Sequence, residues 1–164
     1  MNKQEILEQL KEILTGNNLT LSSAESCTGG LVSSYLTDIS GASNFIFQNF
    51  VTYSNEAKMK FLNVQKETLD KYGAVSNQTA YEMSKGLLNY ADCSLATTGI
   101  LGPTGGTKEK PVGLCYISVG CKDKIKVIKY LSPKASTNDR YEIKKDIAMS
   151  AIKELLNFLK NETD

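Results

Sequence analysis

The chain has 164 residues, 41% of them hydrophobic, and its 19 basic and 18 acidic side chains give a formal net charge of +1. This length suits one globular domain with its own core. No apolar run approaches the about 18 residues of a membrane span, and the small net charge argues against a dedicated nucleic-acid binder.

Histidine is absent. This excludes Ser-His-Asp and Cys-His catalysis within the chain and removes the usual zinc ligand. Any general base must therefore be a carboxylate, a lysine, a tyrosine or a thiolate. We expect no metal and no organic cofactor.

The four cysteines, Cys27, Cys93, Cys115 and Cys121, form no CxxC pair, and the first residues lack the pattern of a signal peptide. These features favour reduced thiols and a cytoplasmic location.

The first part of the chain alternates between helical and extended patterns. Apolar residues recur at helical spacing over residues 2–15, and residues 19–24 alternate as in a β-strand. A second helix is predicted over 28–39. Aromatic and β-branched residues then predict a strand over 45–53.

The middle of the chain is mostly helical. Ser54 is predicted to cap a short helix over 55–62, and another covers 66–72. Ser76 caps a longer helix, and residues 94–99 form the next strand.

A glycine-rich loop, a hairpin and a helix complete the pattern. The loop covers residues 100–111, and two alternating segments, 113–121 and 124–131, predict a β-hairpin. A last helix is predicted from Thr137 onward. Helices that alternate with strands before a terminal hairpin predict a single domain over 1–164, a three-layer α/β/α sandwich with a mixed sheet.

The segment Ala24-Glu-Ser-Cys-Thr-Gly-Gly30 is a strand that turns into a helix through small polar residues and two glycines. Backbone N–H groups at such a turn attract negative charge and can form an oxyanion hole. A hydroxyl here, Ser26 or Thr28, would lie where an oxyanion or phosphate is held, and Gly29 and Gly30 permit close backbone approach. We interpret Ser26 as a nucleophile, although a small polar turn residue is the simpler alternative.

Cys27 is the rival nucleophile, because a thiol near a helix N-terminus has a lowered pKa. If the strand persists this far, its side chain points away from that of Ser26. A buried, structural cysteine is the more common role.

Lys58 follows Tyr53 and Ser54 by about one helical turn. Most lysines are solvated surface charges, and a lysine acts as a base only where burial or a nearby cation lowers its pKa. Lys58 shares a helix face with Ser54, which indicates partial burial. Without histidine, a Ser26–Lys58 dyad is the simplest activated nucleophile.

A second strand exit is also rich in glycine, and it fits neither GxGxxG nor GxxxxGK[ST]. A flexible loop alone would explain it, but ligands in α/β sheets bind outside the carboxyl ends of strands. Arg140, the sole arginine, could bind a phosphate or make a salt bridge in the first turn of a helix. The candidate binding residues in these two segments are Thr98, Gly99, Gly102, Gly105, Gly106 and Arg140.

Five stretches in chain order resemble the C-terminal domain of the CinA (competence/damage-inducible) family, whose stand-alone members include nicotinamide-nucleotide amidases of the PncC type. They are AESCTGG at 24–30, VTYSNEAK at 51–58, YGAVS at 72–76, TGILGP at 98–103 and EKPVG at 109–113. Three positions depart from the family's usual pattern: Leu101, Thr104 and Asn138.

The resemblance implies a hydrolase that converts nicotinamide mononucleotide to nicotinate mononucleotide and ammonia, for NAD salvage. It implies Ser26 as the nucleophile, Lys58 as the assisting base and Tyr53 as an accessory hydroxyl. The binding residues would include Cys27 and Thr28. It also implies a homo-oligomer. Alternating Phe45 and Phe47, together with the hairpin at 113–131, could provide an edge for pairing.

Two alternatives stay open. The domain could be a non-catalytic nucleotide-binding or competence-linked interaction module, or an amidase for another small amide. The expected partner is a small-molecule nucleotide, with no nucleic acid and no membrane.

Overall fold

The computed structural model describes residues 1–163 and contains one five-stranded sheet with the order β2-β1-β3-β4-β5. The strands are β1 (Leu21–Glu25), β2 (Ile46–Val51), β3 (Cys93–Gly99), β4 (Leu114–Cys121) and β5 (Lys124–Leu131). β1 pairs parallel with both β2 and β3, whereas β3–β4 and β4–β5 are antiparallel. The sheet is therefore mixed, as the sequence predicts.

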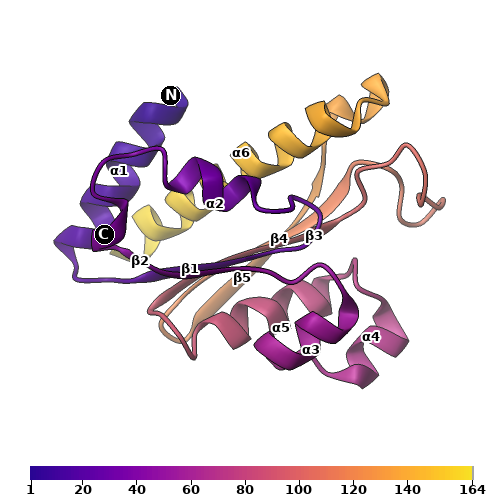
Figure 1. Ribbon diagram of the computed structural model, residues 1–164, viewed down its shortest axis with the longest axis horizontal. Helices are drawn as coiled ribbons and strands as arrows, with labels where there is room; N and C mark the ends of the chain where they lie inside the picture. The colour runs from indigo at the N-terminus through magenta and orange to yellow at the C-terminus, as the bar shows by residue number, and fades with distance from the viewer. Residues whose placement is uncertain (164) are drawn as a thin grey trace.

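Three helices cover one face of the sheet, as Figure 1 shows. They are α1 (Lys3–Gly16), α2 (Leu31–Leu36) and the long α6 (Arg140–Thr163). Two short 3₁₀ helices, Ala42–Asn44 and Pro133–Thr137, precede β2 and α6.

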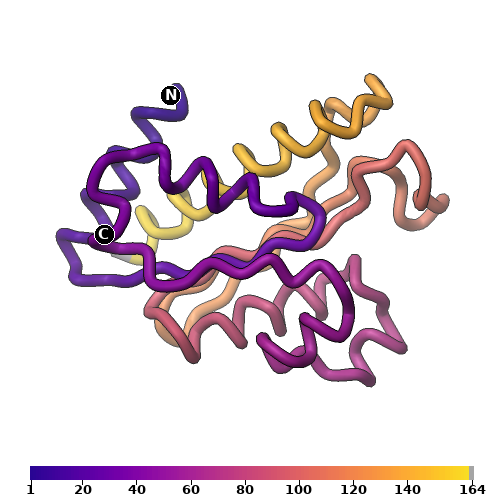
Figure 2. Tube along the Cα trace, in the orientation of Figure 1, coloured from indigo at the N-terminus to yellow at the C-terminus, as the bar shows by residue number. Residues whose placement is uncertain are grey.

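The opposite face is covered by α3 (Asn55–Leu62), α4 (Lys66–Tyr72) and α5 (Asn77–Leu87). The two helical layers enclose the sheet, so the domain is a three-layer α/β/α sandwich. In Figure 2 the turn after β1, the start of α3 and the loop after β3 all lie toward the same end of the sheet.

Each face of the sheet has its own core. The larger core joins the sheet to α1, α2 and α6 and contains Leu21, Leu95 and Ile147. The smaller core lies under α3 and α5 and contains Ala24, Ala96 and other residues. Because these sheet residues are small, α5 lies close to the strands.

Most element boundaries agree with the sequence prediction, but the helix predicted over 28–39 is shorter at both ends. Its first residues form a turn, in which Gly29 and Gly30 have φ values of +59° and +107°. Its last residue is Leu36, and the Thr37 hydroxyl donates to the carbonyls of Ser33 and Ser34. This hydroxyl satisfies carbonyl groups that have no partner where a helix ends.

The last helix begins at Arg140 rather than Thr137. Asn138 has a φ of +53°, which interrupts a helical path, and the Asp139 carboxylate then caps α6. In residues 1–163, no helix combines the length and apolarity that a bilayer crossing requires.

Candidate active site

The candidate site lies where β1 and β3 end at their carboxyl termini. Pairing of the two strands continues one residue beyond β1, where the N–H of Ser26 donates to the carbonyl of Thr97 at 3.0 Å. Ser26 is thereby fixed at the sheet edge where ligands bind in α/β folds.

Lys58 reaches this serine from α3. Its Nζ donates to the Oγ of Ser26 at 2.9 Å, to the carbonyl of Thr52 at 2.9 Å and to the carbonyl of Tyr53 at 3.0 Å. Two of these three partners are carbonyl oxygens, which can only accept. When the amine is neutral, its two N–H bonds satisfy the carbonyls and its lone pair faces the serine hydroxyl.

Burial adjusts the charge of this lysine. The side chain of Lys58 is 1% exposed. It is therefore buried more deeply than the partial burial that the sequence predicts. Removal from water lowers the pKa of Lys58 to about 8, and the nearby Cys27 opposes this shift. With this pKa, about a tenth of the amine is neutral at pH 7, and this fraction can accept a proton.

Local structure explains why Lys58 points inward. Ser54 caps α3, and its Oγ accepts from the N–H of Ala57 at 3.0 Å. The cap sets Lys58 in the first turns of the helix, above the end of β2, where Thr52 and Tyr53 turn their carbonyls toward it. The main chain of Tyr53 therefore contributes more directly than its phenol, which is on a side chain 60% exposed.

The turn after Ser26 is held by Glu25, a carboxylate that is 1% exposed. Its oxygens accept from the N–H groups of Val32 at 2.7 Å and Ser33 at 3.0 Å. The first amides of α2 are consequently occupied, and the sequence-based view that they are free for an anion is wrong. Within residues 1–163, the N–H groups of Cys27 and Thr28 have no hydrogen-bond acceptor.

Cys27 and Thr28 direct their side chains into the interior. The Cys27 Sγ lies 4.0 Å from the Sγ of Cys115 in the larger core, and the Thr28 hydroxyl shares a 2.8 Å hydrogen bond with that of Thr97. Burial raises the pKa of the Cys115 thiol. These side chains stabilise the turn, and the backbone of the turn is the part available to a ligand.

A cavity of about 240 Å³ opens beside Ser26 and Lys58. Among the residues predicted from sequence, those that line it are Ser26, Cys27, Tyr53, Lys58, Thr98, Gly99, Gly102, Gly105 and Arg140. Thr28, Gly29, Gly30 and Gly106 are not among the lining residues. A Cβ added at Gly106 would lie 2.8 Å from the backbone nitrogen of Val112. The glycine therefore allows the loop to pack closely on itself.

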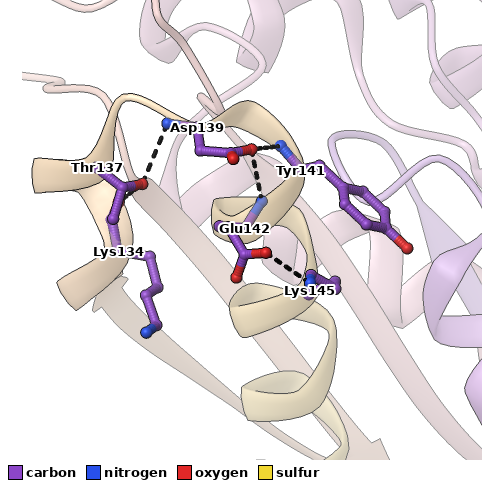
Figure 3. Close-up of polar contacts among 6 residues, drawn as sticks. All are labelled: Lys134, Thr137, Asp139, Tyr141, Glu142 and Lys145. Carbon is purple, nitrogen blue, oxygen red and sulfur yellow. Dashed lines mark hydrogen bonds and ion pairs between the residues drawn. The ribbon is translucent and has the colours of Figure 1, made fainter.

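Arg140 forms the outer wall of this cavity. Its Nη1 donates to the carbonyl of Gly102 at 2.8 Å and its Nη2 to the hydroxyl of Tyr53 at 3.3 Å. Figure 3 shows how the start of α6 is fixed, with Asp139 accepting from the N–H groups of Tyr141 and Glu142. The sequence left a first-turn salt bridge as the alternative role of Arg140. In the structure Glu142 pairs with Lys145 at 2.6 Å, and Arg140 has no carboxylate partner in the part of the chain that the structure describes.

The sequence analysis missed several contributors. Ala74 and Val75 line the cavity from the segment before α5, and the Thr98 hydroxyl holds this segment by donating to the carbonyl of Ala74 at 2.8 Å. Lys144, one turn beyond Arg140, places its Nζ 3.8 Å from the position of a Cβ added to Gly29. Thr98 was itself a candidate from the sequence, whereas no sequence signal indicates Ala74, Val75 or Lys144.

No cluster of three or more histidine, cysteine, aspartate or glutamate side chains suited to a metal occurs in residues 1–163. The arrangement is a serine beside a buried amine with a reduced pKa, at the carboxyl edge of a mixed sheet. It defines an α/β-sandwich protein with a serine–lysine pair at the mouth of a small cavity.

Comparison with known proteins gives the family. The model of the CinA C-terminal domain matches residues 3–159, and the chain belongs to this family. A CinA-like protein of Fusobacterium nucleatum is 50% identical over 141 residues, which cover 86% of this chain and 34% of that protein. A putative competence-damage inducible protein of Thermoanaerobacter pseudethanolicus is 45% identical over 154 residues, 93% of this chain and 36% of that protein. The chain thus spans about a third of these relatives.

The matches with solved structures cover nearly the whole of both chains. The competence/damage inducible protein CihA from Agrobacterium tumefaciens is 38% identical, with a TM-score of 0.87 over 94% of this chain and 95% of that one. The competence damage-inducible protein A from Klebsiella pneumoniae is 28% identical, with a TM-score of 0.90 over 98% of each chain. The α/β fold and the family predicted from sequence are confirmed.

Proposed function

We propose that this chain hydrolyses the carboxamide of nicotinamide mononucleotide through an ester on Ser26, with Lys58 as the general base and acid. The observation that carries the proposal is the 2.9 Å contact between the Lys58 Nζ and the Ser26 Oγ, with both remaining Nζ partners being carbonyls. The arrangement favours proton transfer from the serine to the amine as the hydroxyl attacks.

In the first step, the proton of the Ser26 hydroxyl moves to the amine of Lys58. Neutral Lys58 takes the hydroxyl proton while the Ser26 Oγ bonds to the carboxamide carbon. The oxyanion would be stabilised by the free N–H groups of Cys27 and Thr28, and one such donor typically contributes about 3 kcal/mol. Protonated Lys58 then gives its proton to the departing nitrogen, which leaves as ammonia, and water activated by the same amine hydrolyses the ester.

The choice of a nucleotide rests on the cavity and its outer wall. The cavity volume is about 240 Å³. Pockets that enclose a drug-sized ligand are larger, at about 300–1,000 Å³. The nicotinamide ring can enter the cavity while the phosphate stays near the opening. Arg140 is there and has no carboxylate partner among residues 1–163, and its guanidinium suits an anionic oxygen group.

The charge of the substrate also fits a buried amine. The ring of nicotinamide mononucleotide is a pyridinium cation, and a cation beside Lys58 lowers the pKa of its amine further. Because the same positive charge withdraws electrons from the carboxamide, it makes the carbon easier to attack. We therefore expect the oxidised nucleotide to be the substrate, and its dihydro form, with an uncharged ring, to be a poor one.

The test is ammonia release by the purified protein from nicotinamide mononucleotide, its dihydro form, nicotinamide riboside and free nicotinamide. The proposal expects fastest release from the oxidised nucleotide, abolished by S26A. Faster release from an unrelated amide would replace the substrate while retaining the dyad. Thermal stabilisation by the nucleotide without ammonia release would identify a non-catalytic binding module instead.

A further inference from the structure

Two of the four cysteines form a cross-strand pair at the end of the sheet that is farther from Ser26. Cys93 begins β3 and Cys121 ends β4, and the two residues lie directly opposite each other in the antiparallel register. Both side chains belong to the larger core. They are free thiols, and the Cys93 Sγ lies 2.8 Å from the Cys121 Sγ.

The backbone of this pair has the geometry that a disulfide needs. The N–H of Cys93 donates to the carbonyl of Thr20 at 2.8 Å, so it points toward β1 rather than toward β4. Cys93 and Cys121 are therefore a non-hydrogen-bonded pair of the ladder, in which the Cα atoms are about 4.5 Å apart and the side chains are close. This separation lies within the Cα range of disulfides, about 4.4–6.8 Å.

The sulfur atoms need little movement to bond. A disulfide has a length of about 2.05 Å, so the two Sγ atoms must approach each other by about 0.8 Å, which rotation of the side chains supplies. The other cysteine pair is less suited, because the Sγ atoms of Cys27 and Cys115 are 4.0 Å apart and Cys27 belongs to the turn after β1. That turn would have to move before a bond could form.

The two paired thiols differ in reactivity. The hydrogen bond from the Cys93 thiol lowers the pKa of Cys121, burial opposes this shift, and the charge of Lys122 adds to the lowering. The same hydrogen bond and burial raise the pKa of Cys93. Cys121 is also 7% exposed, whereas Cys93 is 0% exposed. Because the thiolate is the reactive form, Cys121 is the thiol that meets an oxidant first.

We propose that Cys93 and Cys121 are a reversible oxidation site, at which a peroxide converts the two thiols to a disulfide that joins β3 to β4. The Cys121 thiolate attacks one peroxide oxygen, the O–O bond breaks, and Cys121 becomes a sulfenic acid while the second oxygen leaves as hydroxide or alkoxide. The Cys93 thiol then attacks the Cys121 sulfur, and the hydroxyl leaves with the thiol proton as water. Two electrons pass from the two sulfurs to the peroxide, and a dithiol reductant restores both thiols by exchange.

The disulfide would close a long segment that includes one wall of the cavity. Residues 94–120 contain Thr98, Gly99 and the glycine-rich loop. Six residues of β3 separate Cys93 from Gly99, a distance of about 20 Å along the strand. The bond therefore acts on stability, by restricting the unfolded chain, and leaves the geometry at Ser26 unchanged.

The test uses the thiols themselves and needs no substrate, so it stands apart from the proposed activity. The folded, reduced wild type is treated with hydrogen peroxide and then alkylated with a maleimide. Two of its four thiols should escape alkylation, with the mass of two hydrogen atoms lost, and peptide mapping should join Cys93 to Cys121. Dithiothreitol should restore four alkylatable thiols.

Variants assign the role of each cysteine. C121A should form no intramolecular disulfide, and C93A should stop at a sulfenic acid on Cys121, which dimedone traps. C27A and C115A are the matched controls, since both residues belong to the other buried pair, and each should form the disulfide as fully as the wild type.

Thermal unfolding measures the effect of the bond on the fold. The oxidised wild type should have a Tm about 10 °C above that of the reduced form, and dithiothreitol should remove the difference. Four free thiols after peroxide treatment, a bond between Cys27 and Cys115, a disulfide that persists in C121A, or an oxidised form with an unchanged Tm would each overturn the proposal.

Discussion

Ser26 and Cys27 are neighbours in sequence but face opposite layers of the sandwich. The Ser26 hydroxyl lies against Lys58 of α3, whereas the Cys27 Sγ lies 4.0 Å from that of Cys115 in the core beneath α6. The strand ends at Glu25, so the separation arises in the turn that follows it. Only one of the two possible nucleophiles has a base within hydrogen-bond distance.

The first prediction separates these two nucleophiles. S26A should lower ammonia release by about 10⁴-fold or more, because removing a nucleophile removes the covalent route. C27A should keep most of the activity, since its thiol contributes packing. Initial rates with both folded variants check this. Loss of activity in C27A with retention in S26A would assign the chemistry to the thiol.

The second prediction concerns pH. Because Lys58 must be neutral to accept the serine proton, kcat/KM should rise with pH and level off above about pH 8, where burial sets the pKa of this amine. Below that value the rate should fall about tenfold per pH unit. Steady-state rates between pH 6.5 and 9.5 measure it. In C27A the plateau should begin at a lower pH, because Cys27 opposes the lowering of the Lys58 pKa. A rate independent of pH over this range would rule out Lys58 as the base.

Local signals made much of the fold predictable. The bounds of α3 and α4 follow the prediction because a serine cap starts α3 and Gly73, with a φ of +82°, ends α4. The hairpin follows from alternation on both sides of Lys122 and Asp123. The end of α2 was predicted less well, since the Thr37 hydroxyl that satisfies its last carbonyls gives no clear signal in the sequence.

The site was less predictable than the fold. Because the chain lacks histidine, the sequence indicated Lys58 as a candidate base. Its amine is oriented by backbone carbonyls, which any residue type would supply, so the sequence could not indicate them. Glu25 was missed as the group that closes the turn, because a carboxylate at the end of a strand gives no signal of capping a helix six residues later. Lys144 depends on how α6 crosses the sheet, which is a tertiary feature.

A third prediction tests the cost of burying Lys58. Below pH 8 the amine is protonated in both states, and the folded state bears the cost of the buried charge. Between about pH 8 and 10.5 the unfolded chain retains a proton that the folded chain has lost, so the free energy of unfolding rises with pH. The full gain is about 3 kcal/mol.

Lys58→Met lacks this titration. The difference in unfolding free energy between wild type and Lys58→Met, from urea denaturation at pH 7 and pH 11, should therefore change by about 3 kcal/mol in favour of the wild type. Other titrating groups cancel in this difference. A constant difference would mean that the pKa of Lys58 is not lowered in the folded state.

The fourth prediction concerns phosphate recognition by Arg140. Arg140→Met should raise KM for nicotinamide mononucleotide about 10- to 100-fold, the effect of losing hydrogen bonds to a charged group. The rate with nicotinamide riboside, which has no phosphate, should change little. Lys134→Met is the matched control, because Lys134 lies before the same helix (Figure 3) but does not line the cavity. Equal losses with both substrates would contradict a phosphate contact.

The last prediction concerns the packing that holds α3 in place. A Cβ added to Gly86 of α5 would lie 2.1 Å from the carbonyl oxygen of Leu62, which is one turn beyond Lys58 on α3. Backbone cannot give way as a flexible side chain does, so Gly86→Ala should separate the two helices. We expect a loss of about 3 kcal/mol in stability by urea denaturation.

The same displacement should move Lys58 away from Ser26, so folded Gly86→Ala protein should also lose ammonia release. Gly16→Ala is the control, since no atom of residues 1–163 outside its own helix backbone and chain neighbours lies within 4 Å of its added Cβ at the end of α1. Alanine is a better helix former than glycine by up to about 1 kcal/mol, so this variant should be as stable as the wild type or slightly more so. If Gly86→Ala is stable and fully active, close packing of α5 on α3 does not position the amine.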